Sequence, residues 1–147
     1  MKKKLLLLLV FCLAAVTLMA ATSAPESGET LSATDENGIV WTYDTAKKEL
    51  TIGLAEGNTG TTISSYPGVF SEDFDLAEVE TLVIREGITE IADYTFQSLA
   101  SNIALKEITI PASMIAIGKS NFFRVFNLST VNYAGNTEQW NTIEIDY

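Results

Sequence analysis

The chain has 147 residues, with nineteen Asp and Glu against nine Lys and Arg, one Cys and no His. Without an imidazole it cannot form a Ser-His-Asp triad, a Cys-His nucleophile or a His-ligated zinc site, so we expect no catalytic residues, no metal and no cofactor. The net charge of −10 also argues against nucleic acid as a partner, because binding phosphate requires a basic surface.

Residues 1–23 have the pattern of an export signal. Lys2–Lys4 precede an apolar stretch over 5–19, and small residues follow over 20–24. Cleavage would remove Cys12 and three Lys, which leaves six basic residues against nineteen acidic ones and a net charge of −13. We therefore expect a secreted or cell-surface protein with no membrane contact after cleavage. The alternative is an uncleaved anchor, because the apolar stretch approaches the roughly 17 residues that can just span a bilayer.

The first part of the mature chain predicts a lead-in, a hairpin and a loop. Residues 24–38 are polar, acidic and rich in Ser, Thr and Gly, and they predict a flexible lead-in. Residues 39–53 hold two β-prone runs around a polar linker, which predicts a β-hairpin that caps the domain. Leu50 and Ile52 should then continue the apolar column of the repeats that follow. Residues 54–78 are predicted to be a loop, because Gly and Pro interrupt them and large apolar residues are few.

From Val79 onward the chain repeats itself. Six apolar positions recur after 26 residues, in the pairs Val79/Leu105, Leu82/Ile108, Ile84/Ile110, Ile88/Met114, Ile91/Ile117 and Phe96/Phe122. A third copy begins at Leu128, 23 residues after Leu105. This period predicts a solenoid with repeats over 79–104, 105–127 and 128–147, in which each repeat gives one strand to a parallel sheet.

Within a repeat, the spacing of apolar residues changes after the strand. Residues 91–99 and 117–126 place them at mixed intervals of three and four, which predicts a short helical turn in each repeat. Trp140 is expected to pack against the last repeat and close that end.

These residues resemble a known repeat family. The stretch 83–96 and its partner 108–118 are similar to the bacterial BspA-like leucine-rich repeat, and the resemblance extends over roughly 39–145. It implies a single leucine-rich-repeat domain over 39–147, with short parallel β-strands, short helical turns and an N-terminal hairpin cap. Asn121 departs from the family, which often has Ala there, and a buried Asn needs hydrogen-bond partners.

The strand residues that point away from the core are the candidate binding residues. Stacked strands would align them into a flat face of short, mostly polar side chains, open to an extracellular protein or glycan. The residues are Thr51, Thr81, Val83, Arg85, Glu107, Thr109, Thr130 and Asn132. The alternative is that they are ordinary solvated strand positions, because Thr is common in strands for packing reasons alone.

The densest acidic run spans residues 72–80. It lacks the Gly turn and terminal Glu of a calcium loop, so we interpret it as a solvated acidic loop. The same run offers paired carboxylates of the kind that hydrolyse glycosides, but acids are spread through the whole chain, so they give the hypothesis little support.

Together these observations predict an exported, non-catalytic binding module. The missing catalytic residue types argue against an enzyme, and the resemblance implies an adhesion-like role, because the family is associated with surface adhesion. The first alternative is a structural subunit of a larger cell-surface assembly without a ligand of its own. A carboxylate hydrolase is the third hypothesis.

Overall fold

The computed structural model describes residues 28–64, 76–96 and 104–146. The predicted signal at 1–23 and part of the predicted loop lie outside these ranges. Across the described ranges, no helix combines the length and apolar character needed to cross a bilayer.

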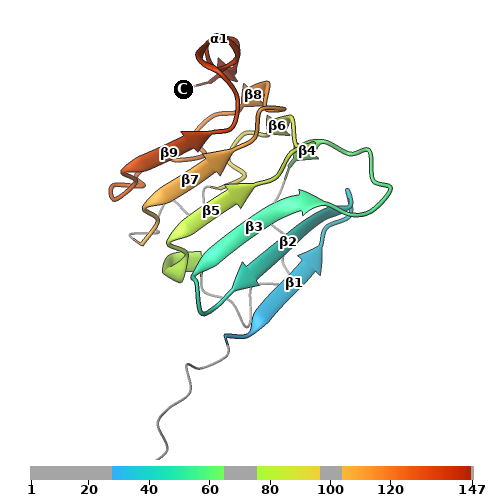
Figure 1. The fold of residues 1–147 in the computed structure, drawn as a ribbon, viewed down its shortest axis with the longest axis vertical. Coiled ribbons are helices and arrows are strands. Elements are labelled where there is room, and N and C mark those ends of the chain that lie inside the picture. The colour runs from blue at the N-terminus through green and yellow to red at the C-terminus, as the bar shows by residue number, and fades with distance from the viewer. Residues whose placement is uncertain (1–27, 65–75, 97–103, 147) are drawn as a thin grey trace, which may run out of the picture.

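A six-stranded sheet forms one side of the fold (Figure 1). Its strands, in spatial order, are β1 (Thr30–Thr34), β2 (Ile39–Asp44), β3 (Glu49–Leu54), β5 (Thr81–Ile84), β7 (Glu107–Ile110) and β9 (Thr130–Tyr133). β1, β2 and β3 pair antiparallel, whereas β3, β5, β7 and β9 pair parallel. The sheet is therefore mixed, with an antiparallel hairpin region at one end and the repeats at the other.

A second, smaller sheet follows the same repeats. Its strands have two residues each and are β4 (Thr62–Ile63), β6 (Glu90–Ile91), β8 (Ala116–Ile117) and β10 (Glu144–Ile145). They pair parallel in the order β10-β8-β6-β4. Helical structure in the described residues is limited to a 3-10 turn, η2 (Leu76–Glu78), and one α-helical turn, α1 (Thr137–Trp140).

The core consists of aliphatic columns that run across the strands. In the large sheet, Leu50 is paired with Leu82 and Leu82 with Ile108, and all three side chains are buried. Ile52 is paired with Ile84, so the prediction that the hairpin continues the repeat columns is confirmed. The small sheet supplies a further column, which is Ile63, Ile91, Ile117 and Ile145.

Aromatic rings cross the same core. Phe96 lies edge-on to Trp41 at 6.0 Å and is stacked with Phe122 at 5.8 Å between ring centroids. At the other end, Trp140 packs edge-on against Tyr133 at 5.3 Å, as predicted. It does not close that end, because Val131 of β9 remains 50% exposed.

Two buried polar side chains tie one repeat to the next. Asn121 accepts a hydrogen bond from the Phe96 amide at 3.1 Å and donates to the carbonyls of Ala92 and Gly118. Thr95, its equivalent one repeat earlier, lies within hydrogen-bond distance of the Ile63 and Ala92 carbonyls. The partners that a buried Asn121 requires are therefore present, and they lie on two successive repeats.

The predicted flexible lead-in at 24–38 is wrong where the structure describes it. Thr30–Thr34 form β1, which pairs with β2 over all five residues. The strand covers the outer edge of β2, which would otherwise expose unpaired N–H and C=O groups. Leu31 and Ala33 pack against the core from this strand.

The predicted loop at 54–78 also contains regular structure. Ile63 of β4 is fully buried and starts the column of the small sheet. Before β4, the Asn58 side chain stabilises the chain by donating hydrogen bonds to the carbonyls of Asn37 and Gly38. The chain from β3 to β4 thus follows the same path as a repeat, although its sequence lacks the period of 26.

The predicted helical turns at 91–99 and 117–126 are wrong over the residues described. The chain forms β6 and β8 and then hydrogen-bonded turns. Tyr94, Ser120 and Arg124 have positive φ angles of 59°, 57° and 65°, which cannot continue a right-handed helix. Residues 97–99 lie outside the described residues.

The ring contacts and burial of Phe96 make this aromatic side chain costly to remove. We expect Phe96→Ala to lower the free energy of unfolding by about 3–5 kcal/mol, because the side chain is fully buried and touches rings on both sides. Urea unfolding of the mature protein measures the change. Phe126→Ala is the matched control, since Phe126 is 82% exposed and its loss should leave the midpoint nearly unchanged. Equal midpoints for Phe96→Ala and the parent would show that Phe96 is not a core residue.

Candidate binding face of the six-stranded sheet

The strand register aligns short side chains into a central row on the outer face of the large sheet. Successive Cα partners run from β1 to β9 without a break. The row is Ser32, Thr42, Thr51, Val83, Thr109 and Asn132. None of these residues is buried, so the row forms a surface six strands wide.

A second row lies one pleat away, two residues nearer the start of β3. It consists of Thr30, Asp44, Glu49, Thr81, Glu107 and Thr130. Its residues are also at least partly exposed, and carboxylates occupy three of the six places. The binding face, defined here as these two rows, therefore presents hydroxyl, carboxamide and carboxylate groups.

Seven of the eight predicted site residues lie in these rows. The eighth, Arg85, follows β5, where its amide donates to the Ile52 carbonyl at 2.8 Å. The Cγ atom of Arg85 would lie 3.4 Å from a Cβ atom built on Gly53, so its aliphatic part passes over that glycine at the rim of the face. Arg85 is brought beside the rows rather than into them.

Sequence reasoning missed the part of the face contributed by β1 and β2. Ser32 and Thr42 extend the central row, and Asp44 extends the second row. The alternation of apolar and polar residues in 39–44 is the pattern that could have identified Thr42 and Asp44 as outward residues. The predicted face therefore began at Thr51 of β3 and included no residue of 30–44.

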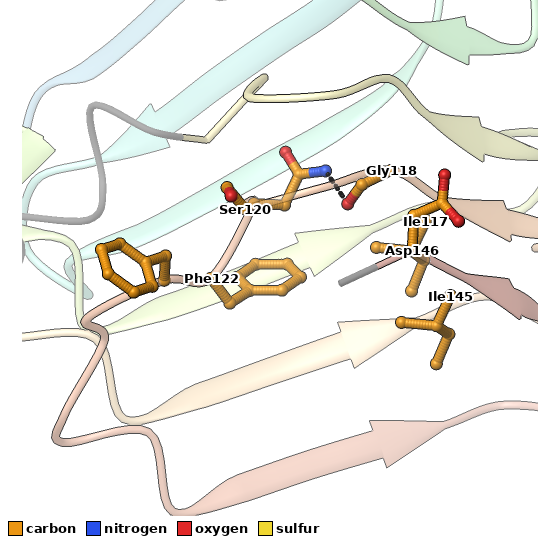
Figure 2. Close-up of a pocket in the computed structure, with 8 residues that line it drawn as sticks. Ile117, Gly118, Ser120, Phe122, Ile145 and Asp146 are labelled. Carbon is orange, nitrogen blue, oxygen red and sulfur yellow. Dashed lines mark hydrogen bonds between the residues drawn. The ribbon is translucent and has the colours of Figure 1, made fainter.

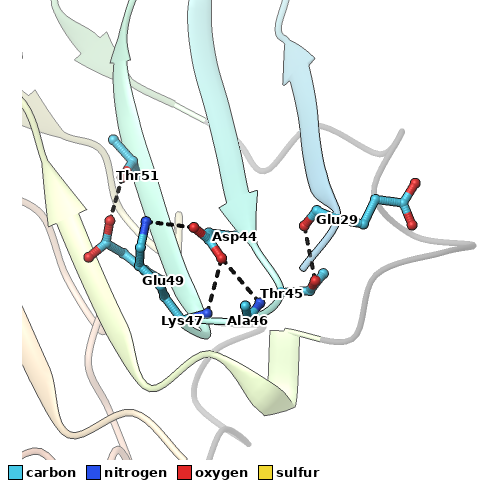
Figure 3. Close-up of polar contacts among 7 residues, drawn as sticks. All are labelled: Glu29, Asp44, Thr45, Ala46, Lys47, Glu49 and Thr51. Carbon is cyan, nitrogen blue, oxygen red and sulfur yellow. Dashed lines mark hydrogen bonds and ion pairs between the residues drawn. The ribbon is translucent and has the colours of Figure 1, made fainter. Parts of the chain in front are cut away.

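Hydrogen bonds within the rows fix several of these side chains. The hydroxyls of Ser32 and Thr42 lie 3.3 Å apart, and Asn132 donates to Glu107 at 2.5 Å. Thr51 donates to Glu49 at 3.4 Å, as Figure 3 shows beside the polar turn between β2 and β3. Because these contacts already order the side chains, the side chains lose less conformational entropy when a ligand binds.

Charged side chains border the second row. In the turn after β2, Lys47 lies 2.6 Å from Asp44, and this hydrogen bond lowers the pKa of the Asp44 carboxyl (Figure 3). Before β5, Glu80 lies 2.6 Å from Lys106 and 3.6 Å from Lys48, so its carboxylate joins the starts of three strands. The hydrogen bond from Lys106 is the main cause that lowers the pKa of Glu80.

The acids do not assemble into a metal site in the part of the chain that the structure describes. No three His, Cys, Asp or Glu side chains there are grouped to hold an ion. Three of the five acids in the run over 72–80 lie outside the described residues, which include the other two, Glu78 and Glu80.

Comparison with known proteins identifies the architecture. A leucine-rich repeat protein from Eubacterium ventriosum superposes with a TM-score of 0.54 at 18% identity, over 73% of this chain and 27% of that one. The chain has a leucine-rich repeat fold. The resemblance predicted from 83–96 and 108–118 is thereby confirmed. This chain spans about a quarter of the length of that neighbour.

Weaker matches carry related descriptions. A leucine-rich cell-surface protein from Faecalibacterium prausnitzii matches with a TM-score of 0.34 and 16% identity, over 83% of this chain and 43% of that one. The pneumococcal vaccine antigen PcpA matches with a TM-score of 0.30 and 16% identity, over 71% of this chain and 38% of that one. No family model and no curated protein matches the chain.

The contacts of Glu80 predict a dependence of stability on acid. Its pKa in the folded protein lies below the ordinary value of 4.5, so the stabilisation is complete above that pH and is lost as the pH falls through the folded value. We expect Glu80→Gln to destabilise the protein at pH 7 and to make its unfolding midpoint less sensitive to pH below about 4.5. Thermal melting across this pH range tests it, with Glu56→Gln in an exposed turn as the control. If both variants lose stability in acid as steeply as the parent, the ion pairs of Glu80 have no role in folding.

Proposed function

We propose that this protein is an exported, non-catalytic binding module, in which a short leucine-rich-repeat solenoid presents its six-stranded face to an extracellular partner. The observation that carries the proposal is the register of the two rows, which keeps twelve outward positions unburied across all six strands. A flat face of this kind suits contact with another macromolecule, whereas small ligands are usually held in concave pockets.

The partner is an extracellular protein or a glycan, and the composition of the face favours a protein. Sugar rings commonly stack on aromatic side chains, and neither row contains one. The second row carries Asp44, Glu49 and Glu107, which suit a partner with basic residues at matching spacing. The predicted leader at 1–23 supports export, and the chain shares its fold with a bacterial leucine-rich repeat protein. The mature chain lacks imidazole and thiol groups, which supports a role without catalysis.

A structural subunit of a larger surface assembly is the second candidate. The observation that favours it is the exposure of core-column residues at the last repeat, where Val131 is 50% and Ile145 is 39% exposed. In this alternative the last repeat packs against another component, and the face has no ligand of its own. This candidate would be supported if the protein associates with itself or with another component of the assembly, and if substitutions in the binding face do not change that association.

A bulky charged side chain in the central row should weaken binding to the partner. We expect Thr51→Arg and Thr109→Arg to weaken binding at least about tenfold, because each places a long side chain in the middle of a flat contact. The measurement is retention of the mature protein on arrays of extracellular-matrix proteins and glycans. Thr59→Arg, in an exposed turn away from both rows, is the matched control.

Melting midpoints show whether each variant is folded, since both Thr51 and Thr109 are only partly exposed. Two results would contradict the proposal. In the first, the parent protein is retained on neither the protein array nor the glycan array. In the second, both row variants are retained as well as the parent.

A further inference from the structure

An apolar pocket, separate from the binding face, lies between the second repeat and the end of the last one. Among the described residues, β9 and β10 are the outermost strands at one end of their sheets. A cavity of about 360 Å³ opens between β8, β10 and the turn at 120–123, and Figure 2 shows Ile117, Phe122 and Ile145 around it. Phe123 also lines this pocket, and its side chain is 60% exposed.

The pocket lies next to a column of aromatic rings. Phe96 is stacked with Phe122 at 5.8 Å, and Phe122 is one of the side chains that line the pocket. A ring placed there could meet Phe122 as Phe96 does, since aromatic pairs are favourable at centroid distances of about 4.5–7 Å. A planar apolar side chain of the size of a phenyl ring therefore suits this pocket.

Carboxylates surround the adjoining surface. A groove of about 540 Å³ shares Ile117, Gly118 and Asp146 with the pocket. Glu90, Asp93, Glu144 and Asp146 are its acidic residues, and all four are exposed.

These four acids have few partners. Glu90 accepts a hydrogen bond from Thr62, and Asp93 accepts one from the Lys119 amide. Within the described ranges, the ion pairs are those of Asp44 and Glu80, so none of these four carboxylates has a cation within 4.0 Å. In the adjoining turn, the Arg124 guanidinium lies over the Phe123 ring, 5.2 Å from its centroid.

Charge distinguishes between the possible occupants. A second copy docked symmetrically through this surface would bring Glu144 and Asp146 toward the same residues of its partner, and such like-charge contacts are unfavourable. We propose that the pocket and groove together bind an extended segment of another protein that carries a phenylalanine-class side chain flanked by lysine or arginine. The ring enters the pocket, and the cations face the four carboxylates.

Short synthetic peptides test this proposal on the mature protein. The probe interleaves lysine, phenylalanine and glycine, and fluorescence anisotropy measures its binding. Two matched peptides replace every lysine by glutamate or every phenylalanine by serine. We expect both to bind at least about tenfold more weakly than the probe, because each removes one of the two complementary features.

Variants locate the site. Glu144→Gln with Asp146→Asn should weaken probe binding about fivefold and reduce its dependence on salt, whereas Glu36→Gln with Glu56→Gln should not. Phe123→Ser should weaken binding about tenfold, whereas Phe126→Ser, which removes an exposed ring outside the pocket, should not. Thr51→Arg on the binding face should also leave probe binding unchanged, which separates this site from the proposed function.

Three results would overturn the proposal. The first is no binding of the probe, and the second is equal binding by the parent and the Glu144→Gln, Asp146→Asn variant. The third is a dimer in sedimentation that Ile145→Lys dissociates, because the occupant would then be a second copy of this chain.

Discussion

The fold depends on in-register packing of aliphatic side chains from successive parallel strands. Leu50, Leu82 and Ile108 lie on three neighbouring strands, yet each is separated from the next by more than twenty residues of sequence. Because side chains alternate across a strand, a shift of one residue would turn such a column outward. The same register that buries the column sets the outward rows, so the core and the binding face are specified by one constraint.

Buried polar contacts reinforce that register. Asn121 and Thr95 bond to backbone groups of the preceding repeat as well as their own, and these bonds form only when the repeats are correctly aligned. A misaligned repeat would leave an unsatisfied buried amide, which costs roughly 1–3 kcal/mol. The departure at Asn121 thus adds specificity to the stacking, although it interrupts the sequence pattern.

Much of the fold could be predicted from the repeat, but its two ends could not. The period of 26 located β5 and β7, and the hairpin pattern located β2 and β3. β1 and β4 were missed because Thr30–Thr34 and Thr62–Ile63 have few large apolar residues and are stabilised by pairing with strands distant in sequence. The turns were mistaken for helices because spacing cannot reveal a positive φ at Tyr94 or Ser120. Seven outward residues were placed correctly, since strand alternation determines them, whereas the pocket at Phe122 and Ile145 depends on where two sheets end.

The most direct test of the in-register stacking is to observe the methyl contacts along the columns by NMR, in the mature protein with labelled Leu, Ile and Val. Adjacent strands lie about 4.8 Å apart, so we expect strong nuclear Overhauser effects from Leu50 to Leu82, from Leu82 to Ile108 and from Ile108 to Val131. Contacts of these residues only with their own sequence neighbours, or with columns offset by one residue, would contradict both the stacking and the face that depends on it.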